Sequence, residues 1–241
     1  MSLLRLGLIG VVFVIIGLIA LMPLSFAHTL SGNAFGPSAT TYGQIWYGRV
    51  YGARFGPAAF ERIDLGLRPV SLLTGKAVFD WTVSDVNARG EGQVFAGFGT
   101  SGVESARLTT SLGGLGLTLP AISPEETVSF NIAHLSMNEA GCQEVDGEVR
   151  TSALIGLAGH YGVAAPMLSG PLSCNHGVLE AALSGDSDAF DLTILVSLAP
   201  SGLWRWQAEA DIQDASLTAV FSSLGFVQDG EVWRARGEGQ L

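Results

Sequence analysis

The first hydrophobic pattern along the chain is an uncharged run over residues 6–24. Its nineteen residues are almost all aliphatic or glycine, and Arg5 is the only charged side chain before it. A helix of this length, rising about 1.5 Å per residue, reaches about 28 Å, close to the roughly 30 Å hydrocarbon core of a bilayer. We therefore predict a membrane-spanning helix, with Pro23 near the end where a helix can stop.

A cleaved secretory signal is the alternative interpretation of this segment. Residues 25–27 (Ser-Phe-Ala) would suit a signal peptidase, but signal hydrophobic regions usually run about 7 to 15 residues behind a clearly basic segment. In both cases the chain after Ala27 leaves the cytosol. Arg5 favours a cytoplasmic amino terminus. We expect residues 1–5 to be cytoplasmic and residues 6–26 to be the anchor. Residues 27–42 are then a spacer, and residues 43–241 form an extracytoplasmic β domain.

Beyond the spacer, hydrophobic and polar residues alternate, which is typical of β-strands. Strands are expected over residues 43–52, 62–68, 76–83, 105–119, 127–135, 147–157, 177–183, 190–198 and 231–236. Their even spacing favours an all-β antiparallel meander, folded either as one curved sheet or as two packed sheets. Residues 214–224 are the exception, because their apolar positions recur at helical spacing and predict a short amphipathic helix.

Two short sequence matches hint at an internal duplication. Residues 89–93 and 236–240 share the sequence Arg-Gly-Glu-Gly-Gln, and residues 65–69 resemble residues 196–200, each ahead of a tryptophan-bearing strand. Five-residue, glycine-rich matches also arise by chance. A true duplication and a chance match therefore both stay open.

Composition and charge narrow the class of protein. The chain has 32 glycines and only 14 % charged residues, which favours many short strands and tight turns over a helical bundle. Its net charge of −10 comes without basic clusters, so nucleic acid and anionic surfaces are not expected as partners. Cys142 and Cys174 lie in the exported part, where thiols oxidise, and predict one disulfide; two buried free thiols are the alternative.

Motifs for catalysis are incomplete in this sequence. Gly75-Lys76 lacks the rest of a phosphate-binding loop, and residues 185–189 (Gly-Asp-Ser-Asp-Ala) lack the second glycine of a nucleophile elbow. The four histidines share no metal-ligand spacing. We therefore predict a protein that is not an enzyme, with no cofactor, metal or small-molecule substrate. An exported hydrolase stays the least favoured alternative.

Two boxes in the amino-terminal half carry a resemblance to a known family. Residues 43–50 (Gly-Gln-Ile-Trp-Tyr-Gly-Arg-Val) and 67–75 (Leu-Arg-Pro-Val-Ser-Leu-Leu-Thr-Gly) follow an apolar helix that ends near Pro23. In this order they resemble the type II (general) secretion pathway protein N family, whose members carry a G-x-[VIL]-W-x-G-[RK] box and then a P-x-S-L-L-x-G box. The distal half is similar as well, notably around Cys142 and over residues 168–174.

This resemblance implies a single-pass inner-membrane protein of a Gram-negative bacterium, with its β domain in the periplasm. Family members are accessory parts of the machine that exports folded proteins across the outer membrane, and they have no known catalytic residues to carry over. We predict contact with other inner-membrane and periplasmic subunits. The candidate partner-binding or structural residues are those of the two boxes: Ile45, Trp46, Tyr47, Gly48, Arg49, Pro69, Leu72, Leu73 and Gly75.

A lipid-handling module of the cell envelope is the alternative function. Its tryptophans would line an apolar trough formed by the curved sheet instead of an ordinary core. The discriminating feature is a continuous inward apolar face along successive strands. An unpaired edge strand could also accept a strand from another protein.

Overall fold

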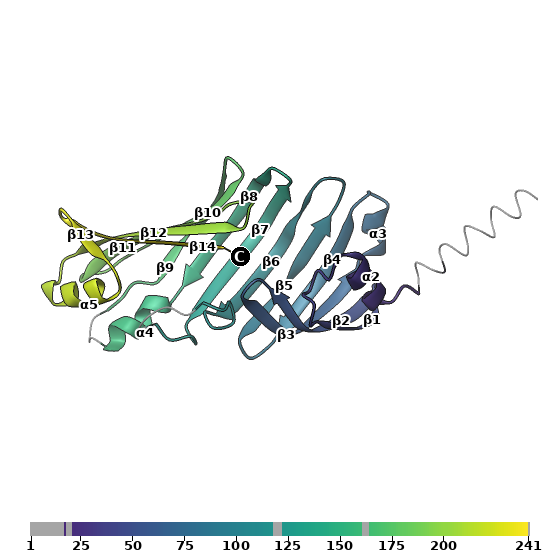
Figure 1. Ribbon diagram of the computed structural model, residues 1–241, viewed down its shortest axis with the longest axis horizontal. Helices are drawn as coiled ribbons and strands as arrows, with labels where there is room; N and C mark the ends of the chain where they lie inside the picture. The colour runs from purple at the N-terminus through teal and green to yellow at the C-terminus, as the bar shows by residue number, and fades with distance from the viewer. Residues whose placement is uncertain (1–16, 18–20, 118–121, 161–163, 241) are drawn as a thin grey trace, which may run out of the picture.

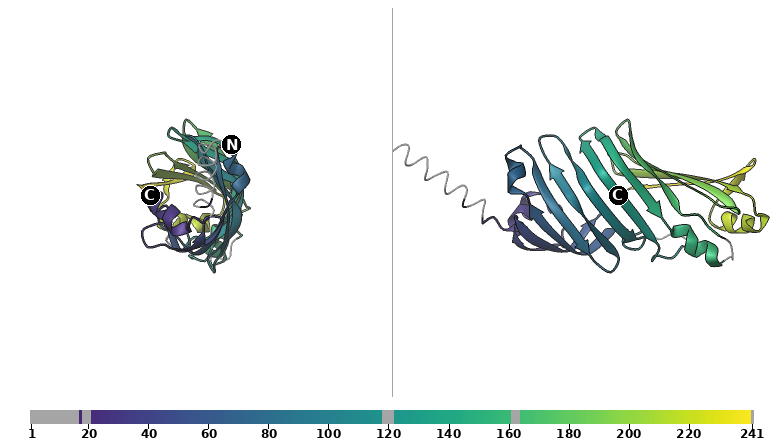
Figure 2. Two further views of the ribbon diagram at one scale, coloured as in Figure 1. Left: turned by 90° about the vertical axis from the view of Figure 1, so that its right-hand side faces the viewer. Right: turned by 180° about the vertical axis from the view of Figure 1, so that it is seen from behind.

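The computed structural model describes residues 17, 21–117, 122–160 and 164–240. In these residues fourteen strands form one antiparallel sheet, in chain order except that β14 lies between β12 and β13 (Figure 1). The predicted antiparallel meander is confirmed, and the structure takes the form of a single curved sheet. Figure 2 shows, in the view along the long axis, that the sheet curls with α2 and α5 inside the curve.

The elements have the following bounds. The strands are β1 (Thr40–Gln44), β2 (Tyr47–Phe55), β3 (Ala58–Leu67), β4 (Ala77–Ser84), β5 (Ala88–Ala96), β6 (Ser101–Ser111), β7 (Thr127–Asn138), β8 (Gly141–Thr151), β9 (Leu168–Asn175), β10 (Val178–Asp186), β11 (Phe190–Leu198), β12 (Leu203–Ile212), β13 (Val227–Asp229) and β14 (Val232–Gln240). The helices are α2 (Leu24–Leu30), α3 (Pro69–Leu72), α4 (Ala153–His160), η1 (Ala215–Leu217) and α5 (Thr218–Ser223).

The two faces of the sheet differ in chemistry over its whole length. Residues that lie directly opposite one another on neighbouring strands point to the same face, because side chains alternate along a strand. On β2 to β9 one inward row is apolar throughout: Val50, Ile63, Val83, Gly90, Leu108, Phe130, Val149 and Gly170. The adjacent outward row is almost entirely polar: Arg49, Asp64, Thr82, Glu91, Arg107, Asn131, Glu148 and Pro171.

The same division continues through the carboxyl-terminal strands. An inward row on β9 to β14 consists of Leu172, Ala181, Val196, Trp206 and Gly237. An outward row on β10 to β14 consists of Glu180, Ser197, Arg205 and Glu238. A one-residue slip in any strand would place its apolar set in water, so this alternation holds the register of the meander.

The buried residues form two clusters at the two ends of the sheet. The cluster at the β2–β5 end includes Leu24 of α2 and Val50. The larger cluster, toward the carboxyl end, includes Leu168 together with Leu217 and Phe221 of the predicted amphipathic helix, which the structure resolves into η1 and α5. Each end of the concave face is therefore covered by a short helix.

A disulfide joins two neighbouring strands whose ladder is short. The ladder between β8 and β9 extends over only four residue pairs, from Glu148–Pro171 to Thr151–Leu168. Beyond the ladder, Cys142 and Cys174 are bonded with Cα atoms 5.4 Å apart, and the Cys142 N–H donates to the Gly177 carbonyl. The predicted disulfide is confirmed, and it connects the strands up to β8 with those from β9 onward.

The predicted membrane helix falls mostly outside the described residues. Within the part of the chain that the structure describes, no helix is both long enough and apolar enough to cross a bilayer. Residues 24–30 form α2. The sequence predicted that they are the end of the anchor and the start of a spacer, but they also contribute to the core. Leu24 is 2 % exposed, because its side chain packs directly over Gly48.

Several predicted strands differ from the structure in their limits, and three of them differ most. Residues 43–52 form the end of β1 and most of β2, with a turn at Ile45–Trp46 between them, because the backbone groups of Ile45 bond to Met22 and Leu67 instead of continuing the ladder. Residues 147–157 split into β8 and α4, where the Thr151 hydroxyl accepts the Ala153 N–H. The expected strand over 105–119 ends at Ser111.

Candidate functional site

The first box divides into a structural part and an exposed part. Ile45 is 5 % exposed, and its backbone N–H donates to the Met22 carbonyl while its carbonyl accepts the Leu67 N–H. Gly48 has no space for a side chain, since a Cβ there would lie 2.6 Å from the Leu24 side chain. Together with the half-buried Trp46, these residues fasten the segment before β1 to the sheet.

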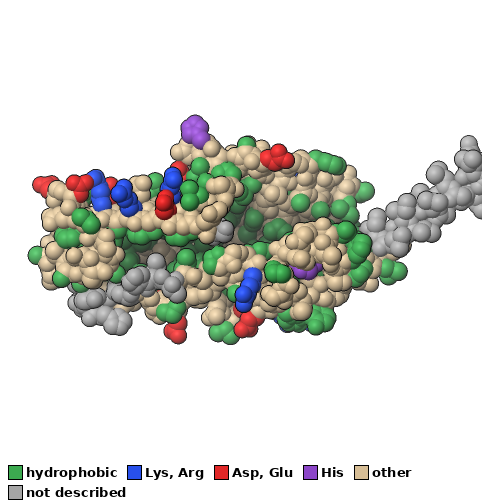
Figure 3. Space-filling view, in the orientation of Figure 1, with side chains coloured by type: hydrophobic (Ala, Val, Ile, Leu, Met, Phe, Trp, Pro, Cys, Tyr) green, Lys and Arg blue, Asp and Glu red, His purple; other side chains and the backbone are tan. Residues whose placement is uncertain are grey.

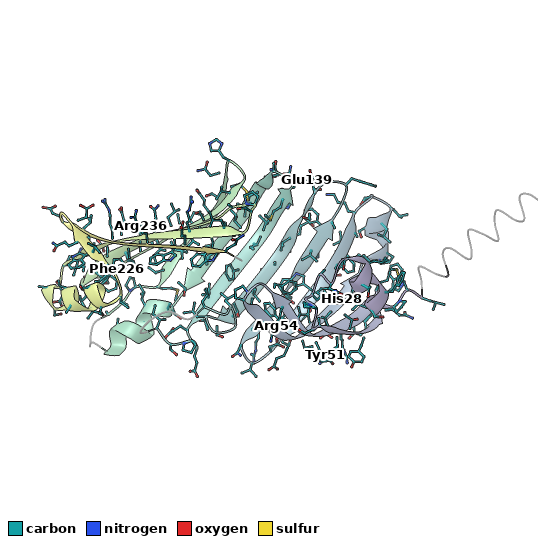
Figure 4. All side chains as sticks on the ribbon, viewed as in Figure 1. His28, Tyr51, Arg54, Glu139, Phe226 and Arg236 are labelled. Atoms are coloured by element: carbon teal, nitrogen blue, oxygen red, sulfur yellow. A yellow bond between two sulfur atoms is a disulfide. The ribbon has the colours of Figure 1, made fainter. Side chains whose placement is uncertain are left out.

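The exposed part of the first box surrounds an arginine on the convex face. Arg49 pairs with Asp64 at 3.1 Å, and Tyr42 meets Tyr51 edge to face with ring centroids 5.7 Å apart. Interaction with the Tyr47 side chain, and next with Tyr51, raises the pKa of Arg49, so the guanidinium stays charged. Tyr51 points away from the curve of the sheet, whereas His28 lies inside it (Figure 4).

The second box forms a fixed turn at the start of β4. Pro69 begins α3, and the Ser71 hydroxyl donates to the Arg68 carbonyl at 2.6 Å and accepts the Val78 N–H at 3.2 Å. Gly75 closes the turn with a φ of 75°, a conformation that glycine adopts without strain. These interactions hold the short helix rigidly although all of its residues are accessible.

This turn presents a patch of apolar side chains to solvent. Val70 is 72 % exposed, Leu72 41 % and Leu73 88 %, and Phe98, from the loop between β5 and β6, is 96 % exposed and lies beside Gly75. We call these four residues the α3 patch. It lies at the end of the molecule where α2 and β1 are found (Figure 1). Contiguous exposed apolar groups of this kind mark interaction sites on folded proteins.

The concave face of the sheet forms a second candidate site, the apolar trough. Figure 3 shows a hollow lined by hydrophobic side chains between β14 and the opposite lip of the sheet. We define the trough by inward-facing residues that are only half-buried: Phe79, Val103, Leu108, Phe130, Ile132, Val145, Leu172, Leu179, Ala181, Val196, Trp204 and Trp206. None of these side chains carries a charge.

Tryptophans lie flat against the floor of the trough because each faces a glycine. Trp81 is opposite Gly92, and Trp204 is opposite Gly239. A Cβ atom at position 239 would lie 2.6 Å from the Trp204 ring, so only glycine lets the indole lie there. Trp206 and Gly237 repeat the arrangement. The glycines belong to the two matching segments, 89–93 and 236–240, which therefore occupy equivalent positions beside tryptophan strands.

The residues considered above as candidates for catalysis or metal binding lie in turns or apart from one another. Ser187, in the incomplete nucleophile elbow, donates to the Phe190 carbonyl and accepts the Phe190 N–H in a turn. Across residues 17, 21–117, 122–160 and 164–240, no three His, Cys, Asp or Glu side chains gather in a way that could hold a metal ion. The two surfaces described above are therefore the candidates for function.

The architecture defines a single-sheet β-trough protein with a polar convex face, an apolar concave face and an exposed patch at one end. The family model described as type II secretion system (T2SS), protein N, matches residues 39–235. The chain therefore belongs to the T2SS protein N family, which confirms the resemblance, and it is a component of type II secretion. Searches of curated proteins and of solved structures found no match.

Proposed function

We propose that the protein is a non-enzymatic accessory component of the type II secretion system that acts by protein–protein contact. Residues 6–26 hold it in the inner membrane with the amino terminus in the cytoplasm, and the sheet lies in the periplasm. Family membership supports the role in secretion. The α3 patch is the single observation that carries the docking role.

The α3 patch suits docking because it is apolar, exposed and already ordered. Leu73 and Phe98 are 88 % and 96 % exposed, so their burial against a partner would remove most of their apolar surface from water. The hydrogen bonds of Ser71 fix the turn before binding. Little conformational freedom is then lost on association, which favours binding.

The position of the patch indicates which kind of subunit it contacts. It lies at the end of the sheet that carries α2, directly after the predicted anchor. With residues 6–26 in the bilayer, this end is close to the membrane surface. The partner is therefore an inner-membrane subunit or the membrane-proximal part of a periplasmic one, and the exposed Tyr47 and Arg49 suit the rim of the same interface.

Strand addition at β14 is a second route to contact. β13 pairs only with residues 232–234 of β14, so residues 235–240 pair within the described chain on the β12 side alone. Such an edge can accept a strand from another protein. Arg236 and Glu238 on this edge weaken it as a general docking site, because charges discourage non-specific pairing.

The test is Leu73→Glu in the full chain, expressed in a strain that lacks the wild-type gene. We expect at least roughly a tenfold loss of inner-membrane secretion subunits captured with the protein after crosslinking, because a charge would be placed in the apolar contact. The matched control is Leu195→Glu on the convex face of β11, where Leu195 is 39 % exposed. Unchanged capture and unchanged secretion with Leu73→Glu would contradict the proposal.

A further inference from the structure

We propose that the apolar trough binds the acyl chain of a lipid. The proposal goes beyond docking, because it concerns the concave face of the sheet and a ligand that is not a protein. Three observations carry it: the chemistry of the lining, the openness of the middle of the trough, and buried polar atoms without partners at one end.

The lining of the trough is apolar along a path long enough for an acyl chain. One inward row of apolar residues crosses five neighbouring strands, from Phe79 on β4 through Val94, Val103 and Leu135 to Val145 on β8. Strands about 4.8 Å apart place β4 and β8 about 19 Å from each other. One leaflet of a bilayer with a core of roughly 30 Å requires about 15 Å of chain, so the path is sufficient.

The middle of the trough stays open while both ends are filled. Leu24 of α2 covers the β2–β5 end. At the other end Phe221 of α5 packs on Phe190 with ring centroids 5.3 Å apart, and Phe226 packs on Phe221 (Figure 4). Trp204, which belongs to neither buried cluster, lies flat over Gly239, so it lines the hollow without filling it.

An acyl chain matches this lining better than a protein segment. The strands that form the floor are hydrogen-bonded to a neighbour on both sides, so the floor offers few backbone groups to a bound peptide, and burying unpaired peptide groups is unfavourable. A second copy of the protein does not fit either. Its convex face carries ion pairs such as Arg49–Asp64 and Arg205–Glu238, which would be desolvated in an apolar trough.

Of the three buried side-chain atoms that lack a hydrogen-bond partner among the described residues, Arg62 Nε is on the outward face of β3 and the other two are on the concave side. Among the described residues, neither Trp81 Nε1 nor His28 Nδ1 has a hydrogen-bond partner, although both atoms are buried. Buried donors are normally paired. The ester carbonyl of a lipid is an acceptor that the Trp81 indole could bind, while the rest of the molecule needs only apolar contacts.

The experiment places a photoreactive side chain in the trough of the full chain. Val196→p-benzoylphenylalanine positions a benzophenone on the inward row, directly opposite Ala181 and Trp206. The matched control is Leu195→p-benzoylphenylalanine, one residue away and facing outward. After irradiation of Gram-negative cells, mass spectrometry of the purified protein is expected to show a lipid adduct at position 196, at least tenfold more abundant than at 195.

A filling substitution tests whether the adduct forms inside the trough. Ala181→Trp, combined with the probe at position 196, is expected to reduce the adduct at least fivefold, whereas Ala182→Trp, which faces outward, is expected to leave it unchanged. Formation of the Cys142–Cys174 disulfide serves as the control for folding. If the probe at 196 prevents folding, Val103 with Glu104 as its outward neighbour provides a second pair on β6.

The outcomes separate this inference from the docking proposal. A folded protein without a lipid adduct at 196 and 103 would overturn it, as would an adduct to another protein or to residues 1–20 of the same chain. None of these results changes the effect of Leu73→Glu on capture of secretion subunits. Failure of one proposal is therefore distinguishable from failure of the other.

Discussion

The amino-terminal region up to β8 and the carboxyl-terminal region from β9 share an inward face but differ outside. Both place tryptophan over glycine on the concave side, with Trp81 on Gly92 in one and Trp204 on Gly239 in the other. On the convex side and in the turns, the amino-terminal region exposes the α3 patch. Ion pairs occur on the convex side of both regions, Arg49–Asp64 in the first and Arg234–Glu209 in the second, so the exposed apolar patch is what sets the amino-terminal region apart. The trough is thus a property of the whole sheet, whereas the α3 patch belongs to one end.

The largest expected effect comes from separating the two regions. Replacing Cys142 and Cys174 together by serine opens a loop with a sequence separation of 32 residues. The chain-entropy model gives a loss of about 3 to 4 kcal/mol in the free energy of unfolding for a loop of this length. Urea denaturation followed by tryptophan fluorescence measures it. A loss below about 1 kcal/mol would mean that the short β8–β9 ladder suffices to join the regions.

A smaller effect distinguishes the two tryptophan–glycine pairs. A Cβ atom at position 92 would lie 2.7 Å from Ala106 Cα in the backbone of β6, which cannot move without disturbing the ladder. At position 239 its nearest neighbours would be atoms of the Trp204 ring, which is a side chain that can shift, and β14 lies near the edge of the sheet. We expect Gly92→Ala to lower the free energy of unfolding by about 2 kcal/mol and Gly239→Ala by about 1 kcal/mol.

The same denaturation experiment measures both variants, and the order of their effects is the result that matters. Equal losses would show that the edge of the sheet is as rigid as its interior. A larger loss for Gly239→Ala would show that the Trp204 ring is held more firmly than the backbone beside Gly92. Gly225→Ala is a poor control, since Gly225 has a φ of 89°. Gly159→Ala suits the purpose better, because a Cβ atom there would meet nothing within 4 Å.

The sheet was predictable because hydrophobic and polar side chains alternate along its strands. The ends of the strands were harder to predict where this alternation is interrupted. The predicted strand 190–198 coincides with β11, since its inward residues are apolar and its outward residues are mostly polar. Residues 153–158 are apolar in a short run, which fits a buried strand and a helix equally well, so α4 was missed. The turn at Ile45–Trp46 was missed because both faces of that segment are partly apolar.

The candidate site was only partly predictable for a different reason. Sequence boxes indicated Leu72 and Leu73, but not their exposure, which depends on how Ser71 ties α3 to β4. Phe98 joins the α3 patch only because the β5–β6 loop folds back beside Gly75. The trough was an alternative from the start, but its open middle results from the curvature of fourteen paired strands, which no local pattern specifies.

The smallest expected effect concerns the amino-terminal caps of the helices that cover the two ends of the trough. α2 follows Pro23 without a side-chain cap, whereas η1 follows Asp214, whose carboxylate accepts the Ser216 N–H at 2.9 Å. Hydrogen bonding to the Ser216 side chain, and next to its backbone, lowers the pKa of Asp214 below its usual range. The ionised carboxylate therefore stabilises the fold above the unfolded-state pKa, and this contribution is lost as the pH falls through the lower folded-state value.

Thermal melts of the wild type and Asp214→Ala at pH 6 and at pH 3 test this prediction. We expect the variant to melt slightly lower at pH 6, and the difference to shrink at low pH, because the wild-type carboxyl is protonated as the pH falls through its lowered folded-state pKa. The control is Glu231→Ala, an exposed carboxylate in the turn before β14. A difference that is the same at both pH values would mean that the charge of Asp214 does not hold the carboxyl-terminal cover in place, and that the packing of Leu217 and Phe221 alone does so.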